Sequence, residues 1–172
     1  RHTRFSHQTD AEFLAIIDTH VHALNQALAS VDANKCRAHI CWGNYAGTHH
    51  RDIDFKKIFH QIMKVHARFI SIEASNHRHA HEWTVFEEFH LPDDKVLMPG
   101  VIDTSSNIVE HPDLVAQRLT QYATLLGPDR VIGSTDCGFA TTASAANVSG
   151  EVAWLKLASL VEGARRAGRH FD

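Results

Sequence analysis

Four segments with the composition of β-strands alternate along this chain with segments that have the apolar spacing of helices. The expected strands cover residues 36–41, 68–73, 95–102 and 130–135. The expected helices cover about residues 11–30, 54–65, 80–88, 110–126 and 150–168, so one helix comes first and four strand–helix repeats follow. This alternation predicts a parallel sheet with helices outside it and right-handed crossovers. We therefore expect an α/β fold, with residues 1–172 as a single domain.

The composition narrows the choice of partners and compartment. With 172 residues, of which 44% are hydrophobic, the chain is long enough for one sizeable core. A formal net charge of -3 and no basic run argue against nucleic acids and membranes as main partners, and no apolar run approaches the roughly 20 residues of a spanning helix. The cysteine count of 3 is odd, which fits a reducing, cytoplasmic setting better than a disulfide framework. Because the chain starts with Arg1, we expect that it begins inside a longer protein or was trimmed.

Polar residues stand where each expected strand ends, namely His39 and Cys41, Glu73, Asp103, and Cys137. Residues two apart in an extended chain point to the same face, so His39 and Cys41 are aimed at one spot. Chemistry in parallel α/β folds sits at the C-terminal ends of the strands. An imidazole, two thiolates and a carboxylate suit four-coordinate zinc. The expected zinc ligands are therefore His39, Cys41, Glu73 and Cys137.

This donor set indicates which reaction the metal would serve. Two thiolates and a carboxylate make the cluster net negative, so the zinc would be a poor activator of water. It would be well suited to bind an incoming thiol and to lower the pKa of that thiol. Glu73 is the hardest ligand and is expected to swing away when the thiol arrives, which gives it a catalytic role. The inferred reaction is alkyl transfer to sulfur.

Several segments together resemble a known family. They are residues 37–41 (RAHIC), 70–76 (ISIEASN), 100–106 (GVIDTSS) and 135–138 (TDCG). In this order they resemble the catalytic domain of cobalamin-independent methionine synthase. Residues 41–45 (CWGNY) and 109–112 (VEHP) are similar to the single-domain branch of that family, which includes epoxyalkane:coenzyme M transferase. The resemblance extends from about Asp18 to Gly168.

The resemblance implies a (β/α)₈ barrel of the TIM type with zinc at its mouth, held at the positions of the four ligands named above. Such a barrel has about 250 residues, so this chain would carry the C-terminal half, with the other half upstream, on another polypeptide or supplied by a homodimer. The thiol acceptor would be homocysteine or coenzyme M, and the alkyl donor a methylated folate or an epoxide. The implied reaction is thus a zinc-dependent methyl or alkyl transfer to a small thiol.

Further residues are expected around the substrate. Asp103 is a candidate for catalysis or a polar substrate contact, or it caps the following segment. At the position of the proton-donating His in the Asp-x-His-Ser motif of methionine synthases, this chain has Ser105, so that acid is missing. The other expected substrate contacts are Trp42, Asn44, Tyr45, Asn76 and Ser105, with plain packing as the alternative for Trp42 and Tyr45 and support of the zinc ligands as the alternative for Asn76.

Two other functions remain open at this point. Residues 17–22 (IDTHVH) look like the Asp-x-His-x-His of metal-dependent amidohydrolases, which would require a strand that ends at Asp18 and a site made by His20, His22 and Asp136. The chain could also be a non-catalytic half-barrel that binds zinc. The histidine runs at residues 49–50 and 77–81 are expected to lie on the surface and to bind metal only adventitiously.

Overall fold

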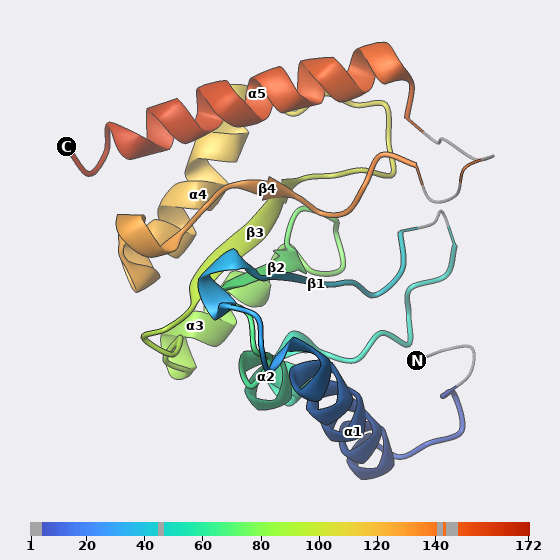
Figure 1. Cartoon of the computed structure of the whole chain (residues 1–172). Coiled ribbons are helices and arrows are strands. Elements are labelled where there is room, and N and C mark those ends of the chain that lie inside the picture. The colour runs from blue at the N-terminus through green and yellow to red at the C-terminus, as the bar shows by residue number, and fades with distance from the viewer. Residues whose placement is uncertain (1–4, 45–46, 141–142, 144–147) are drawn as a thin grey trace.

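A computed structural model describes residues 5–44, 47–140, 143 and 148–172. Its centre is a parallel sheet with the strand order β1-β2-β3-β4 (Figure 1). The strands are β1 (Arg37–Ile40), β2 (Phe69–Glu73), β3 (Val96–Ile102) and β4 (Ser134–Thr135). The helices are α1 (Asp10–Leu28), α2 (Phe55–Met63), α3 (Val85–Glu88), α4 (Pro112–Leu126) and α5 (Gly150–Gly168). The predicted α/β fold with a parallel sheet is confirmed.

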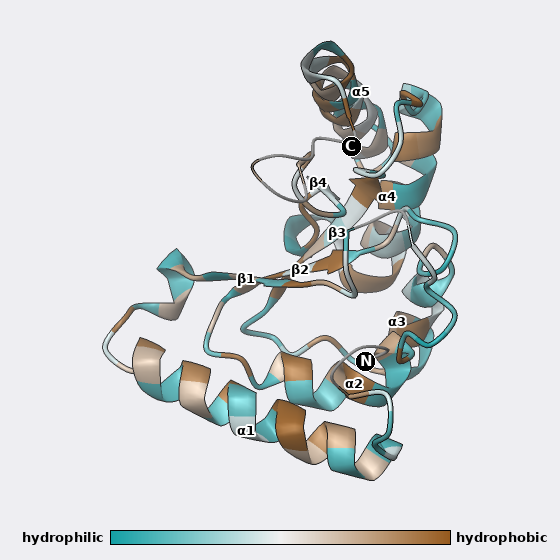
Figure 2. Cartoon of the chain, turned by 90° about the vertical axis from the view of Figure 1, so that its right-hand side faces the viewer, coloured by the Kyte–Doolittle hydropathy of each residue, from teal (hydrophilic) through white to brown (hydrophobic). Residues whose placement is uncertain are grey.

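The face of the sheet that the helices cover is buried, because the side chains that point to it are apolar. Ile70 and Ile72 of β2 and Leu97 of β3 are each 0% exposed, as expected for strands that have neighbours on both sides. One core cluster joins β2 to α2 and α3, and a second joins β3 to α4 and α5. The helices thus follow the sheet from one edge to the other, with α1 and α2 at one end and α4 and α5 at the other (Figures 1 and 2).

The helices begin at residues whose side chains satisfy the first free amides. Thr9 caps α1 and forms a capping box with Glu12. Ser149 caps α5 by accepting a hydrogen bond from the amide of Val152, and Pro112 occupies the first turn of α4. These local signals explain why the helix limits predicted from the sequence lie close to the observed ones.

Two sequence predictions about elements were wrong in part. The strand expected at 130–135 is reduced to β4, because residues 128–130 form a 3₁₀ turn and Val131 makes only an isolated bridge to Leu97. The helix expected at 80–88 is a 3₁₀ turn, Glu82–Thr84, followed by the short α3. There the buried side chain of Glu82 accepts a hydrogen bond from the amide of Phe55, which fixes the chain in a turn. In helix α5, the apolar side chains of Leu155 and Val161 are 51% and 70% exposed.

The strand that the amidohydrolase interpretation needs does not exist. Asp18, His20 and His22 all lie inside the continuous helix α1. His20 and His22 are exposed, and Asp18 forms an ion pair with Lys64 of the chain segment after α2. The hydrolase alternative is therefore wrong, since its ligands cannot stand at the end of a strand.

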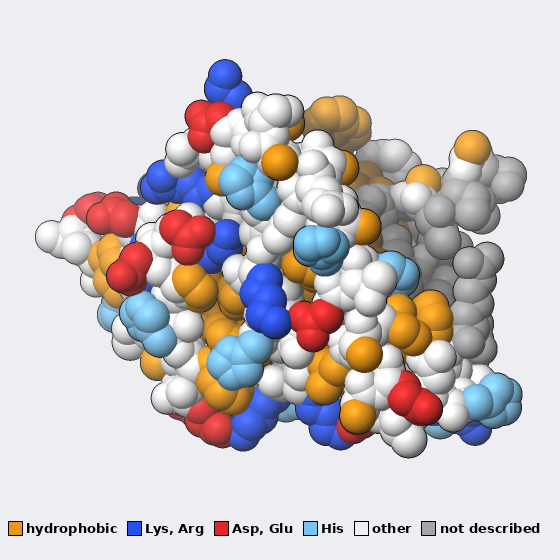
Figure 3. Space-filling view, turned by 60° about the horizontal axis from the view of Figure 1, so that its bottom comes forward, with side chains coloured by type: hydrophobic (Ala, Val, Ile, Leu, Met, Phe, Trp, Pro, Cys, Tyr) orange, Lys and Arg blue, Asp and Glu red, His pale blue; other side chains and the backbone are white. Residues whose placement is uncertain are grey.

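The surface over α1 and α2 mixes both signs of charge (Figure 3). Exposed ion pairs such as Lys57–Asp10 and Lys56–Glu88 contribute to this pattern. None of the helices in the described ranges combines the length and apolarity that crossing a membrane would need.

Candidate metal centre

Three of the four expected ligands converge at the C-terminal end of the sheet. His39 lies in β1, Cys41 follows it, and Cys137 follows β4. The Nε2 atom of His39 and the Sγ atom of Cys41 each lie 3.3 Å from the Sγ atom of Cys137. The ligand atoms of the three residues all lie within 4.8 Å of one another. The fold thus brings together residues that are almost a hundred positions apart in the sequence.

This convergence requires a strongly curved sheet. β1 and β4 are the first and last strands in the sheet order, so three strand spacings separate them. In a flat sheet that distance would be about 14 Å, which short cysteine side chains cannot span. A hydrogen bond of 2.7 Å from the Nδ2 atom of Asn44 to the carbonyl of Gly138 connects the segments that follow the two strands. The sheet therefore has the curvature of a barrel wall.

The fourth expected ligand, Glu73, lies beside the other three. It ends β2, is 4% exposed, and its Oε1 atom lies 3.6 Å from the Sγ atom of Cys137. Its carboxylate is held from two sides, because Oε1 accepts a hydrogen bond of 2.9 Å from the amide of Trp42 and Oε2 accepts one of 2.8 Å from Asn76. Glu73 is thus fixed next to the three-residue cluster without being one of its closest members.

The arrangement fits a zinc ion. Two sulfurs on one tetrahedral zinc lie ~3.8 Å apart, given a Zn–S distance of ~2.3 Å, and the two cysteine sulfurs already lie 3.3 Å apart. The Nδ1 atom of His39 forms a hydrogen bond of 3.0 Å with the hydroxyl of Ser71, which orients the ring so that Nε2 faces Cys137. Both the donor types and their orientation would suit a zinc ion.

Crowding of acidic groups shifts their pKa values in opposite directions. The hydrogen bond from the thiol of Cys137 holds the pKa of Cys41 well below its ordinary value, and the same contact raises the pKa of Cys137. The Cys41 thiolate in turn raises the pKa of His39. Burial, and then the neighbouring Cys41, raise the pKa of Glu73 to about 7. A divalent cation would relieve this crowding of negative charge.

A cavity of about 210 Å³ adjoins the centre. Four of the residues expected near the substrate line it together with Glu73, namely Asn44, Asn76, Asp103 and Ser105. Asp103 also closes a local turn, since its Oδ1 atom accepts hydrogen bonds of 2.9 Å and 2.7 Å from the amide and hydroxyl of Ser105. Burial opposes the charge on Asp103, but the hydrogen bonds from serines outweigh it and lower the pKa of this carboxyl. Both interpretations of Asp103 thus have a structural counterpart.

The side chain of Trp42 packs against Ile53 and His79, beside the metal centre. Its indole Nε1 donates a hydrogen bond of 2.7 Å to the carbonyl of Ile53, and its ring lies 4.3 Å from that of His79, centroid to centroid. Its contribution to the site is the backbone amide that binds Glu73. Tyr45, the other aromatic residue expected at the pocket, lies outside the described residues.

Asp136 has a function that the sequence did not reveal. It is 3% exposed and accepts hydrogen bonds from the backbone amides of Ala74, Ser75 and Asn76, at 2.8, 2.9 and 3.0 Å. Because it lies between β4 and Cys137, it couples the turn after Glu73 to the turn that carries Cys137. Burial raises the pKa of Asp136 in spite of these donors. The only sequence signal was a carboxylate directly before a ligand.

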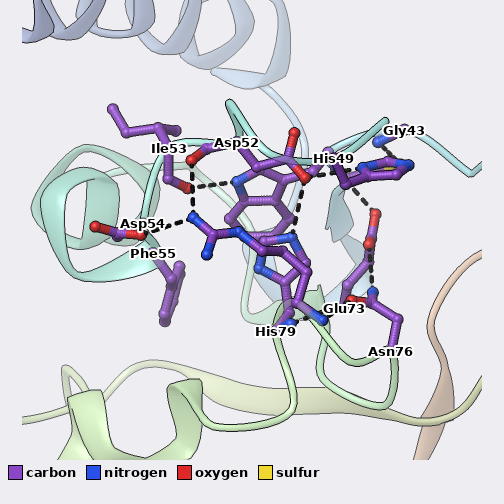
Figure 4. A network of polar contacts seen from close by, with 12 residues as sticks. Gly43, His49, Asp52, Ile53, Asp54, Phe55, Glu73, Asn76 and His79 are labelled. Atoms are coloured by element: carbon purple, nitrogen blue, oxygen red, sulfur yellow. Dashed lines mark hydrogen bonds and ion pairs between the residues drawn. The ribbon is translucent and has the colours of Figure 1, made fainter. Parts of the chain in front are cut away.

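The histidine runs were also misjudged. His79 is 2% exposed, and its Nδ1 atom lies 3.0 Å from the carboxylate of Glu82. His49 lines the cavity, and its Nδ1 atom lies 2.8 Å from the carboxylate of Asp52 (Figure 4). In each case an acidic residue follows the histidine by three positions, which is the signal that could have identified them. Surface binding of adventitious metal therefore does not describe these two histidines.

The fold and the site together define an α/β protein that gathers a zinc-type donor set at the C-terminal ends of parallel strands. Residues 16–164 match the family described as cobalamin-independent synthase, catalytic domain. The chain therefore belongs to this family, as the resemblance of its motifs predicted.

Individual relatives agree with this assignment. The 2-hydroxypropyl-CoM lyase of Xanthobacter autotrophicus is 28% identical over an alignment 173 residues long, and this alignment covers 86% of this chain and 44% of the lyase. The 5-methyltetrahydropteroyltriglutamate–homocysteine methyltransferase of Nitratidesulfovibrio vulgaris is 30% identical over 159 residues, or 92% of this chain and 18% of that enzyme. The structure of a B12-independent methionine synthase from Shewanella sp. W3-18-1 in complex with selenomethionine matches with a TM-score of 0.71 at 23% identity, over 92% of this chain and 46% of that chain. This chain thus spans less than half the length of these proteins.

Proposed function

We propose that this chain carries the zinc centre of a thiol alkyltransferase and that its four ligands are His39, Cys41, Glu73 and Cys137. The observation that carries the proposal is the approach of these side chains, from β1, β2 and β4, to one spot at the C-terminal end of the sheet. The names of the two relatives point the same way, because one concerns a coenzyme M thioether and the other a methyl group for homocysteine. The common chemistry is a bond between carbon and the sulfur of a small thiol.

When bound, zinc would supply a Lewis acid that lowers the pKa of the acceptor thiol and keeps its sulfur nucleophilic. The chain's own residues hold the parts in place. Ser71 orients the ring of His39, while the amide of Trp42 and the side chain of Asn76 orient Glu73. With its pKa raised to about 7, Glu73 is able to take up a proton near neutral pH when a thiol replaces it. Asn44, Asn76, Asp103 and Ser105 would bind the polar part of a substrate in the adjoining cavity.

The remainder of a barrel would complete the active site. The relatives are more than twice as long as the segment they share with this chain, and the inner face of the sheet carries a second cavity, of about 310 Å³, beside His39 and Cys137. A further half of the polypeptide or a second copy of this chain would cover that face. The protein would work in the cytoplasm on a small thiol and a methyl or epoxide donor.

Metal analysis tests the centre. After loading with zinc and removal of excess metal, the protein should retain about one ion per chain. Cys41→Ser and Cys137→Ser should abolish this retention. Cys36→Ser is the matched control, because Cys36 is a buried core thiol directly before β1, whereas Cys41 directly follows this strand. X-ray absorption at the zinc edge should show two sulfur neighbours. A protein that remains metal-free after loading would refute the proposal.

A second candidate function is a half-barrel that binds zinc without catalysis. Ser105 in place of a proton-donating histidine favours it. Transfer of an alkyl group to 2-mercaptoethanesulfonate or homocysteine by the zinc-loaded protein would distinguish the two. Retention of zinc without any acceleration of transfer would support the non-catalytic function.

A further inference from the structure

His49 has a position and a partner that the metal centre does not use. It lines the same cavity as Glu73, Asn76 and Asp103, and its side chain is 25% exposed. The Asp52 carboxylate beside its Nδ1 atom is only 1% exposed. A buried carboxylate that accepts from Nδ1 fixes the orientation of the imidazole and leaves proton exchange with a guest in the cavity to Nε2.

A second buried histidine, His79, lies behind the Asp52 carboxylate (Figure 4). The Oδ2 atom of Asp52 lies 3.6 Å from the Nε2 atom of His79, and the Nδ1 atom of His79 lies 3.0 Å from Glu82. The other oxygen of Glu82 accepts a hydrogen bond of 2.7 Å from the amide of Phe55. The side chains of His79 and Glu82 are 2% and 4% exposed. Burying two carboxylates costs free energy, and apolar contacts would anchor a loop at a lower cost, so this network indicates a purpose beyond anchoring.

The proposed reaction needs a group of this kind. When a thiolate sulfur forms a bond to an alkyl carbon, the bond from that carbon to oxygen or nitrogen breaks, and its electron pair stays on the heteroatom. That heteroatom must receive a proton. The segment after β3, residues 103–106, offers serines at the place where an acid is expected. Asp103 itself accepts hydrogen bonds from Ser105, which favour its ionised form and make it a poor acid.

We propose that His49 is the catalytic acid of this protein, which protonates the oxygen or nitrogen that leaves the alkyl donor, and that Asp52 and His79 are its positioning residues. This inference rests on the function proposed above. His49 in its protonated form gives the Nε2 proton to the heteroatom, keeps the hydrogen on Nδ1 that Asp52 accepts, and becomes neutral. The proton that the acceptor thiol loses, taken up first by Glu73, restores the charged ring, so thiol and donor are converted to thioether and protonated leaving group without any further reactant.

The test compares donors that do and do not need an acid. Zinc-loaded wild-type protein is given 2-mercaptoethanesulfonate with propylene oxide or 5-methyltetrahydrofolate, whose leaving atoms need a proton, and separately with methyl iodide, whose iodide does not. With the acid-requiring donor, His49→Gln should lower the rate by about 10²- to 10⁴-fold, the usual contribution of a general acid. With methyl iodide the rate should stay close to that of wild type. His50→Gln is the matched control, since the neighbouring His50 is exposed.

A readout independent of turnover tests the positioning residues. Long-range ¹H–¹⁵N spectra of the neutral His49 ring should show the hydrogen on Nδ1, and Asp52→Asn should shift the tautomer ratio toward Nε2.

Each other outcome has a definite meaning. Equal loss with both kinds of donor, or no loss with either, would overturn the proposal for His49. Wild-type transfer from methyl iodide but from neither acid-requiring donor would overturn it while leaving thiol activation intact. If wild type accelerates transfer from no donor at all, the proposed function fails, and the assignment of His49 as its acid fails with it.

Discussion

Replacement of Asp136 by asparagine should destabilise the protein and weaken its metal centre together. The carboxylate of Asp136 receives the backbone amides of residues 74–76, which form the turn directly after Glu73. Asparagine has nearly the same shape, so its oxygen can keep the two donors that now bind Oδ1. Its amide nitrogen, however, would face the amide of Asn76, which now lies 3.0 Å from Oδ2, and two donors would then oppose each other.

The magnitude follows from these contacts. A hydrogen bond to a charged group contributes about 1.5–3 kcal/mol. The substitution removes the bond from the Asn76 amide and the longer one, 3.3 Å, from the Asn76 side chain, and it takes the charge away from the two bonds to Oδ1. Burial raises the pKa of Asp136, so the ionised side chain already bears a desolvation cost that asparagine avoids. The net loss should therefore be about 2–4 kcal/mol, a large part of the roughly 5–15 kcal/mol that stabilises a domain. With an m value of about 2 kcal/mol/M, the urea midpoint should fall by about 1–2 M.

Urea unfolding followed by circular dichroism, with a chelator present, isolates the effect on folding from any effect of metal. Asp129→Asn is the control, because Asp129 is exposed in the 3₁₀ turn before β4. Zinc affinity, measured by competition with a chromophoric chelator, should fall for Asp136→Asn and not for the control. If Asp136→Asn unfolds at the wild-type urea concentration, the hydrogen bonds to residues 74–76 do not stabilise this end of the sheet and the reasoning is refuted.

Two further predictions concern the same region. Burial raises the pKa of Glu73 to about 7, and the pKa of Cys137 is also raised, so zinc must displace protons from both residues. The affinity for zinc should therefore rise between about pH 6 and 8, and calorimetry in buffers of different ionisation enthalpy should detect the released protons. An affinity that does not depend on pH would contradict this prediction. A Cβ atom on Gly100 would lie 2.5 Å from the Cα atom of Asp136, so Gly100→Ala should cost about 1–3 kcal/mol or more in urea unfolding. Gly138→Ala, where a Cβ atom would meet nothing within 4 Å, should cost little, and equal stability of the two variants would show that the close approach at Gly100 is not real.

The part of the site that the sequence predicted follows from regular geometry. Residues two apart in a strand share a face, and the C-terminal ends of parallel strands meet at one edge of the sheet. These two rules were enough to expect His39, Cys41, Glu73 and Cys137 close together, and the expectation held for Cys137 although only residues 134–135 of its expected strand pair with β3. No knowledge of loops was needed for this step.

The part that was missed depends on contacts between distant segments. Asp136 is paired with amides some sixty residues earlier in the chain. The inward turn of His79 is decided by Glu82, which in turn is fixed by the amide of Phe55. Lys156 of helix α5 is buried because its Nζ atom forms an ion pair, at 3.0 Å, with the Oε2 atom of Glu110 in the segment before α4. Neither periodicity nor composition reports such pairings, so polar residues in the interior were assigned to the surface.

The curvature of the sheet has a consequence for how the function is divided. The donor set comes from the two outermost strands and β2, so this chain alone brings together every proposed ligand. The inner face beside them is open, which is why His39 and Cys41 are exposed although they belong to the centre. In a closed barrel, side chains from the other strands fill that space. We infer that zinc affinity is a property of this half of the barrel, whereas the choice of thiol and alkyl donor depends also on the surface that covers β1 and β4. Addition of a complementary half should therefore change substrate selectivity and the exposure of Cys41 much more than it changes the affinity for zinc.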